Sequence, residues 1–192
     1  IAVGENVRGL VTHNNGKTLQ AMLSVLNDLG YRASFKILRA QYLDVPQKRE
    51  RLVIIGVRKD LDMPILFPKE NDYTITIREA LVNVPSSASQ QYPTRKREIM
   101  ALVPPGGYWR NLPIELQKEY MAGSFHLGGG KTGMARRLSW DEPSLTLTCS
   151  PAQKQTERCH PEETRPLTVR EYARIQTFPD DWNFAGSINA QY

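Results

Sequence analysis

Three charged side chains near the start of the chain are of types that could do acid–base or electrostatic chemistry. Glu5 follows the apolar stretch Ile1–Val3, and Arg49 and Arg51 precede the apolar stretch Leu52–Val57. A carboxyl group can give or take a proton, and a guanidinium can stabilise a developing negative charge. Neither pattern is informative alone, because short acidic triplets recur by chance and arginines at a strand start commonly face solvent. Chemistry must therefore be argued from their order and spacing.

The elements that hold these groups are predicted from periodicity. Ile1–Val3 predicts a core strand, and residues 4–10 predict a loop at its C-terminal end, where ligands gather in open α/β sheets. Asn15 is the expected N-cap of a core-packing helix over residues 17–29, whose Leu and Met side chains recur at helical spacing. Gly30 is the expected C-terminal glycine.

Two more strands complete this part. Tyr31–Leu38 alternates like a strand, and the continuous apolar run Leu52–Val57 is typical of a strand buried on both faces. Strand, helix, strand and strand at these lengths predict half of an α/β sheet.

The composition changes near residue 63. From there to about residue 163 the chain is richer in Pro, Gly, Ser and Gln. Short helices are expected at 77–82 and 113–120, loops at 104–107 and 128–130, and a strand at 144–149. We interpret this region as a small irregular domain inserted into the first. The basic cluster 95–97 is expected to be solvated, with phosphate contact as the alternative.

The stretch Arg165–Asp180 predicts a short, sharply bounded helix. Thr168 and Glu171 form a capping box, in which each side chain satisfies a backbone N–H at the helix start, and Pro179 ends the helix.

Composition limits the class of protein. Hydrophobic residues make up 40% and charged residues 23% of 192 residues, which is ordinary for a folded protein, and the net charge of +5 is compatible with a polyanionic partner. The two cysteines do not indicate a disulfide framework, and the Cys and His spacings do not match a zinc site. No apolar run approaches the ~20 residues of a membrane span, and no signal peptide is visible. Because the chain lacks an initiator Met and opens inside an expected strand, we expect a piece of a longer protein.

Three motifs in order resemble those of the cytosine-5 DNA methyltransferases. The string R-x-L-T-x-R-E-x-A-R-x-Q-x-F-P-D over 165–180 resembles their ninth motif, Glu5-Asn6-Val7 their sixth, and P-Q-x-R-x-R over 46–51 their eighth. The weakly defined seventh would fall among 31–42. Trp140–Thr146 is similar to the approach to the Thr-Leu pair of their recognition regions.

The resemblance implies an α/β fold: part of a Rossmann-like S-adenosylmethionine-dependent methyltransferase sheet, with a small, irregular and mainly β target-recognition domain. It implies three segments: residues 1–66 as the second half of the catalytic domain, 67–164 as the recognition domain, and 165–192 as the ninth-motif helix and the return toward the catalytic domain. The full enzyme is expected to be monomeric and to act in a bacterial cytoplasm, on the nucleoid, as the modification half of a restriction–modification system.

The resemblance also assigns roles. In this family a cysteine thiolate adds to carbon 6 of a flipped cytosine, which makes carbon 5 nucleophilic. Glu5 would act as the acid at N3, Arg51 would stabilise charge at O2, and Arg49 would assist or contact phosphate. Asn6 and Gln47 would orient the loops. Recognition of double-stranded DNA would fall to the inserted domain, with these candidates: Arg136, Arg137, Thr146, Leu147, Thr148, Arg165 and Gln153–Gln155.

Parts of the family pattern are absent from the sequence. The glycine-rich loop for S-adenosyl-L-methionine, the Pro-Cys-Gln nucleophile and the Gly-Asn-Ala-Val segment are not found. No cofactor-binding or metal residue is therefore assigned, and the chain alone is expected to bind the cofactor poorly and to transfer no methyl group; the missing half would come in cis or from another polypeptide. The alternatives are an RNA methyltransferase on the same scaffold, a DNA-binding module without catalysis, and a structural protein.

Overall fold

A computed structural model describes residues 1–129 and 131–192, so one residue of the expected loop 128–130 lies outside the described residues. The chain forms two compact units. Unit 1 comprises residues 1–44 and 48–73, and unit 2 comprises residues 45–47 and 74–192.

Unit 1 extends past residue 66, the predicted end of the first segment. The reason is a set of bonds from 67–73 back to unit 1: Asn71 N–H donates to Tyr42 O over 2.8 Å, and the Tyr73 hydroxyl donates to Asp44 over 2.7 Å. Residues 165–192, the predicted third segment, belong to the same compact unit as residues 74–164.

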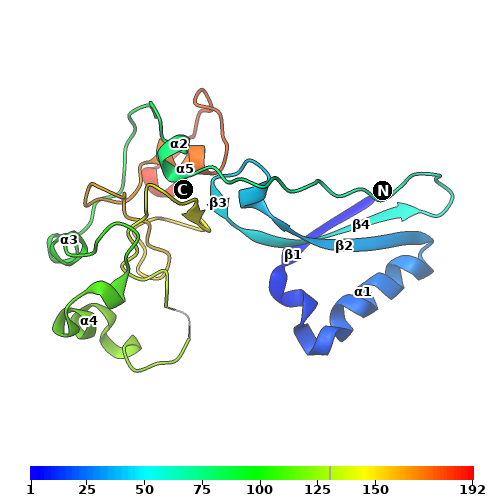
Figure 1. The fold of residues 1–192 in the computed structure, drawn as a ribbon, viewed down its shortest axis with the longest axis horizontal. Coiled ribbons are helices and arrows are strands. Elements are labelled where there is room, and N and C mark those ends of the chain that lie inside the picture. The colour runs from blue at the N-terminus through cyan, green and yellow to red at the C-terminus, as the bar shows by residue number, and fades with distance from the viewer. Residues whose placement is uncertain (130) are drawn as a thin grey trace. The chain divides into compact units, whose positions relative to one another are not determined.

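Unit 1 contains a three-stranded antiparallel sheet with the strand order β1-β4-β2. The strands are β1 (Ala2–Val7), β2 (Tyr31–Arg39) and β4 (Glu50–Arg58), and both outer strands pair with β4 (Figure 1). The predicted strands in 31–38 and 52–57 are confirmed. The first strand is longer than predicted, because its ladder with β4 continues to the pair Val7 and Arg51.

Helix α1 (Lys17–Asp28) packs on one face of this sheet (Figure 1). Leu19, Leu52 and Ile54 form the buried centre, and the predicted Gly30 follows the helix with φ of 84°. The predicted N-cap is wrong: Gly16 occupies that position in the left-handed region, and Asn15 precedes it, also left-handed.

Two further expectations for unit 1 fail for one reason. Val3 is 70% exposed and Met22 is 40% exposed, although both were expected in a core. Strand β1 lies at an edge of the described sheet, so neither β1 nor the outer part of α1 is covered.

Unit 2 is irregular, as predicted. Its helices are α2 (Ile77–Ala80), α3 (Thr94–Ala101), α4 (Ile114–Met121) and α5 (Val169–Ile175). The expected β structure is confined, in the described residues, to β3 (Gln47–Lys48) paired with β5 (Ser144–Leu145) and two isolated bridges. Short 3-10 turns complete the chain: Arg8–Val11, His13–Gly16, Ala40–Tyr42, Trp109–Asn111, Ala122–Ser124 and Ile188–Ala190.

Two hydrophobic clusters stabilise unit 2. One is built around Met100, Trp109 and Met121, and the other joins α2 and α5 through Ile77 and Ile175. The capping box of α5 is present as predicted: Thr168 Oγ1 accepts the Glu171 N–H, and Glu171 accepts the Thr168 N–H. Within the described residues no helix is long and apolar enough to cross a bilayer.

The basic cluster 95–97 differs from its prediction as a solvated face. It lies on α3, a helix not predicted from sequence, and Arg95 does reach solvent while pairing with Glu98 and Glu119. Lys96 instead points inward, where its amine lies 2.6 Å from the fully buried carboxylate of Glu157. The cluster is therefore split between surface and core.

Candidate functional site

The Glu5 and Arg51 side chains meet on one face of the β1–β4 ladder. Glu5 is paired with Val53 and Val7 with Arg51, so Glu5 and Arg51 are diagonal neighbours on the same side of the sheet. Arg51 Nε lies 2.7 Å from Glu5 Oε1. The Glu5 side chain is 56% exposed and that of Arg51 is 26% exposed, so the carboxylate remains open to a ligand.

A second guanidinium converges on the same carboxylate. Arg49 Nη2 lies 3.9 Å from Glu5 Oε1. Burial lowers the pKa of Arg49, the charge of Arg51 lowers it further, and the carboxylate of Glu5 opposes both effects. The sheet thus brings together the three groups that the sequence predicted, one carboxylate between two guanidiniums.

Asn6 does not join this cluster, because successive side chains of a strand point to opposite faces. Its Oδ1 accepts the N–H of Val7 over 2.8 Å, which fixes the end of β1. The prediction of a loop over 4–10 is therefore wrong for Glu5 and Asn6, which both lie in β1.

Gln47 belongs to unit 2 and is 2% exposed. Its Oε1 accepts the N–H of Leu147 over 3.1 Å, and the preceding carbonyl of Pro46 accepts the N–H of Ser144 over 2.9 Å. Gln47 and Pro46 therefore hold the segment 144–147, and the orienting role of Gln47 in catalysis stays a prediction.

Two of the predicted DNA contacts are buried inside unit 2. Leu147 is 2% exposed within the α2–α5 cluster, so it is a packing residue. Arg137 is 3% exposed, and its guanidinium donates to five carbonyls and one hydroxyl: Met100 O, Val103 O, His160 O, Glu162 O, Glu163 O and Thr164 Oγ1. With its donors so engaged, Arg137 holds loops together and is not presented to a phosphate.

Arg165 is likewise engaged within the protein. Its two terminal nitrogens each lie 2.8 Å from the Glu171 carboxylate, and it also donates to Glu163. The hydrogen bond with Glu171 raises the pKa of Arg165. Its geometry indicates that it braces the start of α5, and its DNA contact stays a prediction.

The remaining candidates are accessible to differing degrees. Thr148 and residues 153–155 are exposed, and Thr146 is half-buried with its carbonyl accepting from Arg158 over 2.6 Å. Arg136 is half-buried over the Tyr108 ring, 5.6 Å from its centroid, and burial lowers its pKa. These residues stay candidates for DNA contact.

A buried polar cluster in unit 2 was missed from sequence. His160 is 6% exposed, its Nδ1 accepts the N–H groups of Glu162 and Glu163 over 3.3 and 3.0 Å, and its ring meets Trp140 edge to face. His160 Nε2 lies 3.9 Å from Glu171, and burial lowers the pKa of the imidazole despite that carboxylate. No spacing in the sequence signals this contact.

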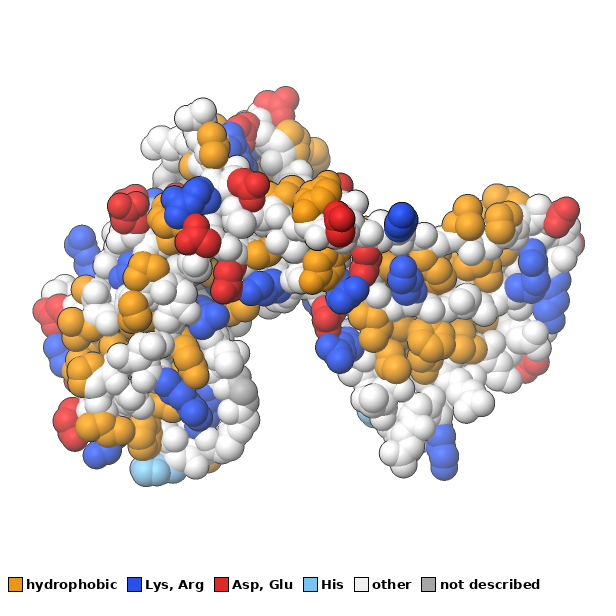
Figure 2. Space-filling view, viewed as in Figure 1, with side chains coloured by type: hydrophobic (Ala, Val, Ile, Leu, Met, Phe, Trp, Pro, Cys, Tyr) orange, Lys and Arg blue, Asp and Glu red, His pale blue; other side chains and the backbone are white. Residues whose placement is uncertain are grey.

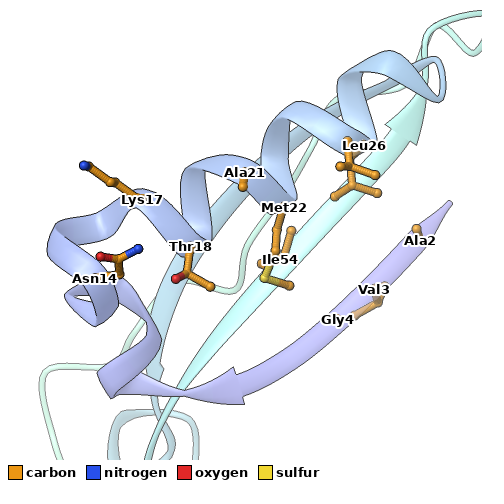
Figure 3. A pocket seen from close by; sticks show the side chains of 11 residues that line it. Ala2, Val3, Gly4, Asn14, Lys17, Thr18, Ala21, Met22, Leu26 and Ile54 are labelled. Atoms are coloured by element: carbon orange, nitrogen blue, oxygen red, sulfur yellow. The ribbon is translucent and has the colours of Figure 1, made fainter.

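Unit 1 also carries an apolar groove of about 830 Å³ between α1 and β1. Met22, Leu26 and Ile54 point into it, and Val3 and Val25 line it as well (Figure 3). Hydrophobic side chains gather on this part of the surface (Figure 2). In the described residues, no group of three or more His, Cys, Asp or Glu side chains is placed to hold a metal ion.

Comparisons with known proteins agree with the order of motifs. The chain is 59% identical to the Type II methyltransferase M.Eco47II of Escherichia coli over 202 aligned positions, covering 100% of this chain and 48% of that protein. It is 56% identical to the Type II methyltransferase M.Sau96I of Staphylococcus aureus, covering 99% of this chain and 45% of that protein. The chain thus spans about half the length of the curated relatives it matches.

Solved structures support the fold. The Dnmt2 methyltransferase of Schizosaccharomyces pombe aligns with a TM-score of 0.58 at 14% identity, covering 98% of this chain and 58% of that one. The profile of the C-5 cytosine-specific DNA methylases matches residues 2–192. The chain therefore belongs to the C-5 cytosine-specific DNA methylase family.

Proposed function

We propose that this chain is the C-terminal half of a DNA cytosine-5 methyltransferase, the modification enzyme of a bacterial restriction–modification system. The full enzyme transfers a methyl group from S-adenosyl-L-methionine to carbon 5 of a cytosine flipped out of double-stranded DNA. Family membership supports the chemistry, and the relatives named Type II methyltransferases support the system.

The observation that carries this proposal is the convergence of Arg51 and Arg49 on the carboxylate of Glu5. When a nucleophile adds to carbon 6 of cytosine, electron density moves toward N3 and O2. The carboxyl of Glu5 shares a proton with N3, and the guanidinium of Arg51 stabilises charge at O2. Because the sheet holds the acid and the cation 2.7 Å apart, both reach one edge of the same ring.

The described residues do not fit S-adenosyl-L-methionine by themselves. The groove between α1 and β1 is lined mainly by aliphatic side chains, and none of its lining residues is a carboxylate that would bind the ribose hydroxyls. The cofactor site and the nucleophilic cysteine therefore belong to the other half of the enzyme.

The groove and the edge strand β1 form the surface on which we expect that other half to pack. Val3 and Val25 are more than half exposed there, and a contiguous apolar surface of this kind is typical of an interaction site. A strand pairing with β1 would satisfy its free backbone groups.

The experiment is methyl transfer from labelled S-adenosylmethionine to mixed-sequence duplex DNA. The chain is tested alone and then with the N-terminal half of M.Eco47II supplied, and a Met22→Glu variant provides a groove control. Activity in the second tube only, lost with Met22→Glu, is the expected result. Inactivity in both tubes with salt-sensitive DNA binding retained would overturn the proposal in favour of a binding module. Transfer to tRNA and not to DNA would overturn the choice of substrate.

A further inference from the structure

The loop that follows Leu147 in unit 2 is fixed at its base by three hydrogen bonds to its backbone carbonyls. The Tyr172 hydroxyl donates to Cys149 O over 2.7 Å, and Arg158 N–H donates to Pro151 O over 2.9 Å. Lys96 Nζ donates to Ala152 O over 2.7 Å. We call residues 148–156 the reading loop. Its tip, residues 153–155, is exposed.

Lys96 is the one of these anchors that also carries a charge into the core. Its amine lies 2.6 Å from Glu157 Oε1, and Glu157 has no exposed surface. The Tyr120 hydroxyl donates to the other oxygen of Glu157. Burial raises the pKa of Glu157, and Lys96 counteracts that rise. One partly buried cation, the Lys96 amine, therefore joins the loop backbone to the carboxylate at the loop's end.

The reading loop borders an open cavity of about 760 Å³, whose other wall is formed by residues 89–91, Ile188, Asn189 and Tyr192. The wall is held together by Gln90, which donates to Asn189 Oδ1 over 2.6 Å and is hydrogen-bonded to Ser150. Neither acidic nor basic side chains occur among the lining residues.

Two amides in this cavity keep unused hydrogen-bonding groups. Gln153 accepts from Cys149 Sγ through Oε1, and its NH2 group has no partner among the described residues. Gln91 donates to Ser89 over 3.2 Å, and its carbonyl has no partner there either. A donor and an acceptor in an uncharged, water-accessible cavity match the groups on base edges, and no Lys or Arg lines the cavity to pair with a phosphate charge.

We propose that Gln153 and Gln91 determine the target sequence by hydrogen bonding to base edges in the DNA major groove, and that Lys96 is a positioning residue that fixes the reading loop for them. This inference rests on the proposed function, since it names the part of the enzyme that selects the DNA.

The test uses the full-length protein and compares kcat/KM for methylation of the target duplex with that of duplexes altered at one base pair. Gln153→Ala and Gln91→Ala are expected to lower the discrimination at one position of the site by about tenfold, because a good side-chain contact to a base supplies about that factor. Equal discrimination in wild type and in both variants would overturn the inference.

Lys96→Met is expected to lower discrimination at the same position, with partial rescue in Lys96→Arg, which keeps donors for Ala152 O and Glu157. The control is Lys118→Met, whose amine is exposed and 3.7 Å from Glu115. A merely structural role for Lys96 would reduce stability and total activity but leave the ratio between sequences unchanged, which contradicts the proposal. If Lys96→Met does not fold, Tyr120→Phe removes one bond of the same network and is read the same way.

Failure of the proposed function can be distinguished from failure of this inference. If the wild-type protein methylates no DNA, the proposed function fails, and binding of fluorescent duplexes to the same variants still tests the reading loop. If the wild type methylates a defined sequence and the variants keep its discrimination, only this inference fails.

Discussion

Arg51 Nε and Glu5 Oε1 lie 2.7 Å apart across the diagonal of the β1–β4 ladder. Strand β4 also carries Glu50, which forms a second ion pair of equal length with Arg8, at 2.7 Å. The pairs differ in their surroundings, because a second guanidinium, that of Arg49, approaches Glu5 as well. Distance alone therefore does not distinguish the two ion pairs, whereas the convergence of two cations on one carboxylate does.

Glu5→Gln in the full-length enzyme is expected to lower kcat by about 10²- to 10⁴-fold, the usual contribution of a positioned acid. The free energy of unfolding should change by less than about 1 kcal/mol, since the Glu5 side chain is more than half exposed. Single-turnover methyl transfer measures the first quantity and urea unfolding the second. Glu50→Gln is the matched control, and equal losses in the two variants would remove Glu5 from its role.

The capping box of α5 should contribute more to the free energy of unfolding than that of α2. Thr168 holds Glu171, which is 4% exposed and doubly bonded to Arg165, whereas Thr76 caps α2 with the exposed Glu79. We expect Thr168→Ala to cost about 2 kcal/mol and Thr76→Ala about 0.5 kcal/mol, the two ends of the range for such caps. Urea unfolding of the chain gives both values, and a larger loss for Thr76→Ala would refute the ranking.

The capping box was predictable because it is a local pattern. Thr168 and Glu171 stand three residues apart, and Gly30 follows its helix directly, so neither depends on a distant part of the chain. The roles of Glu5 and Arg51 came from motif order, and the antiparallel register places the two side chains together.

What could not be predicted depends on distant partners. Arg137 is indistinguishable from Arg136 in sequence, yet it is buried because carbonyls from 100–103 and 160–163 converge on it. Helix α3 was not predicted because its buried residues, Ile99 and Met100, are adjacent and show no helical period. Lys96 turns inward because Glu157, far along the chain, is buried beside it.

Unit 2 should lose stability between pH 7 and pH 5 because of His160. Burial lowers the pKa of its imidazole, outweighing the attraction of Glu171. The unfolded chain therefore takes up a proton near pH 6.5 before the folded one does, so stability is full above that pH and falls below it. Protonation of Nδ1 would also break its bonds from the Glu162 and Glu163 N–H groups.

The measurement for His160 is urea unfolding at several pH values. His160→Asn keeps an acceptor near the Nδ1 position and does not titrate, so its stability should be flat between pH 7 and pH 5. Below about pH 4.3 a second loss is expected in both proteins, since the folded pKa of Glu171 is lowered by Arg165 and Thr168 against the effect of burial. A steep loss between pH 7 and pH 5 in His160→Asn would contradict the assignment.

Substitutions at the adjacent residues Arg136 and Arg137 should have different effects on the stability of unit 2. Arg137→Lys leaves several buried carbonyls without donors, at about 1–3 kcal/mol for each unsatisfied group, so the free energy of unfolding should fall strongly. Arg136 keeps its guanidinium half-exposed over Tyr108, and Arg136→Gln should unfold within about 1 kcal/mol of wild type.

The salt dependence of DNA binding should also differ between the Arg136 and Arg137 variants. For Arg136→Gln the affinity of the full-length protein should fall alike for all sequences, and the slope of log affinity against log salt should shrink by about one, as expected for one lost phosphate contact. For Arg137→Lys the folded fraction, assayed at low temperature, should keep the wild-type slope. A reduced slope in Arg137→Lys with Arg136→Gln unchanged would mean that the buried arginine turns outward when DNA binds, reversing the assignment made from their burial.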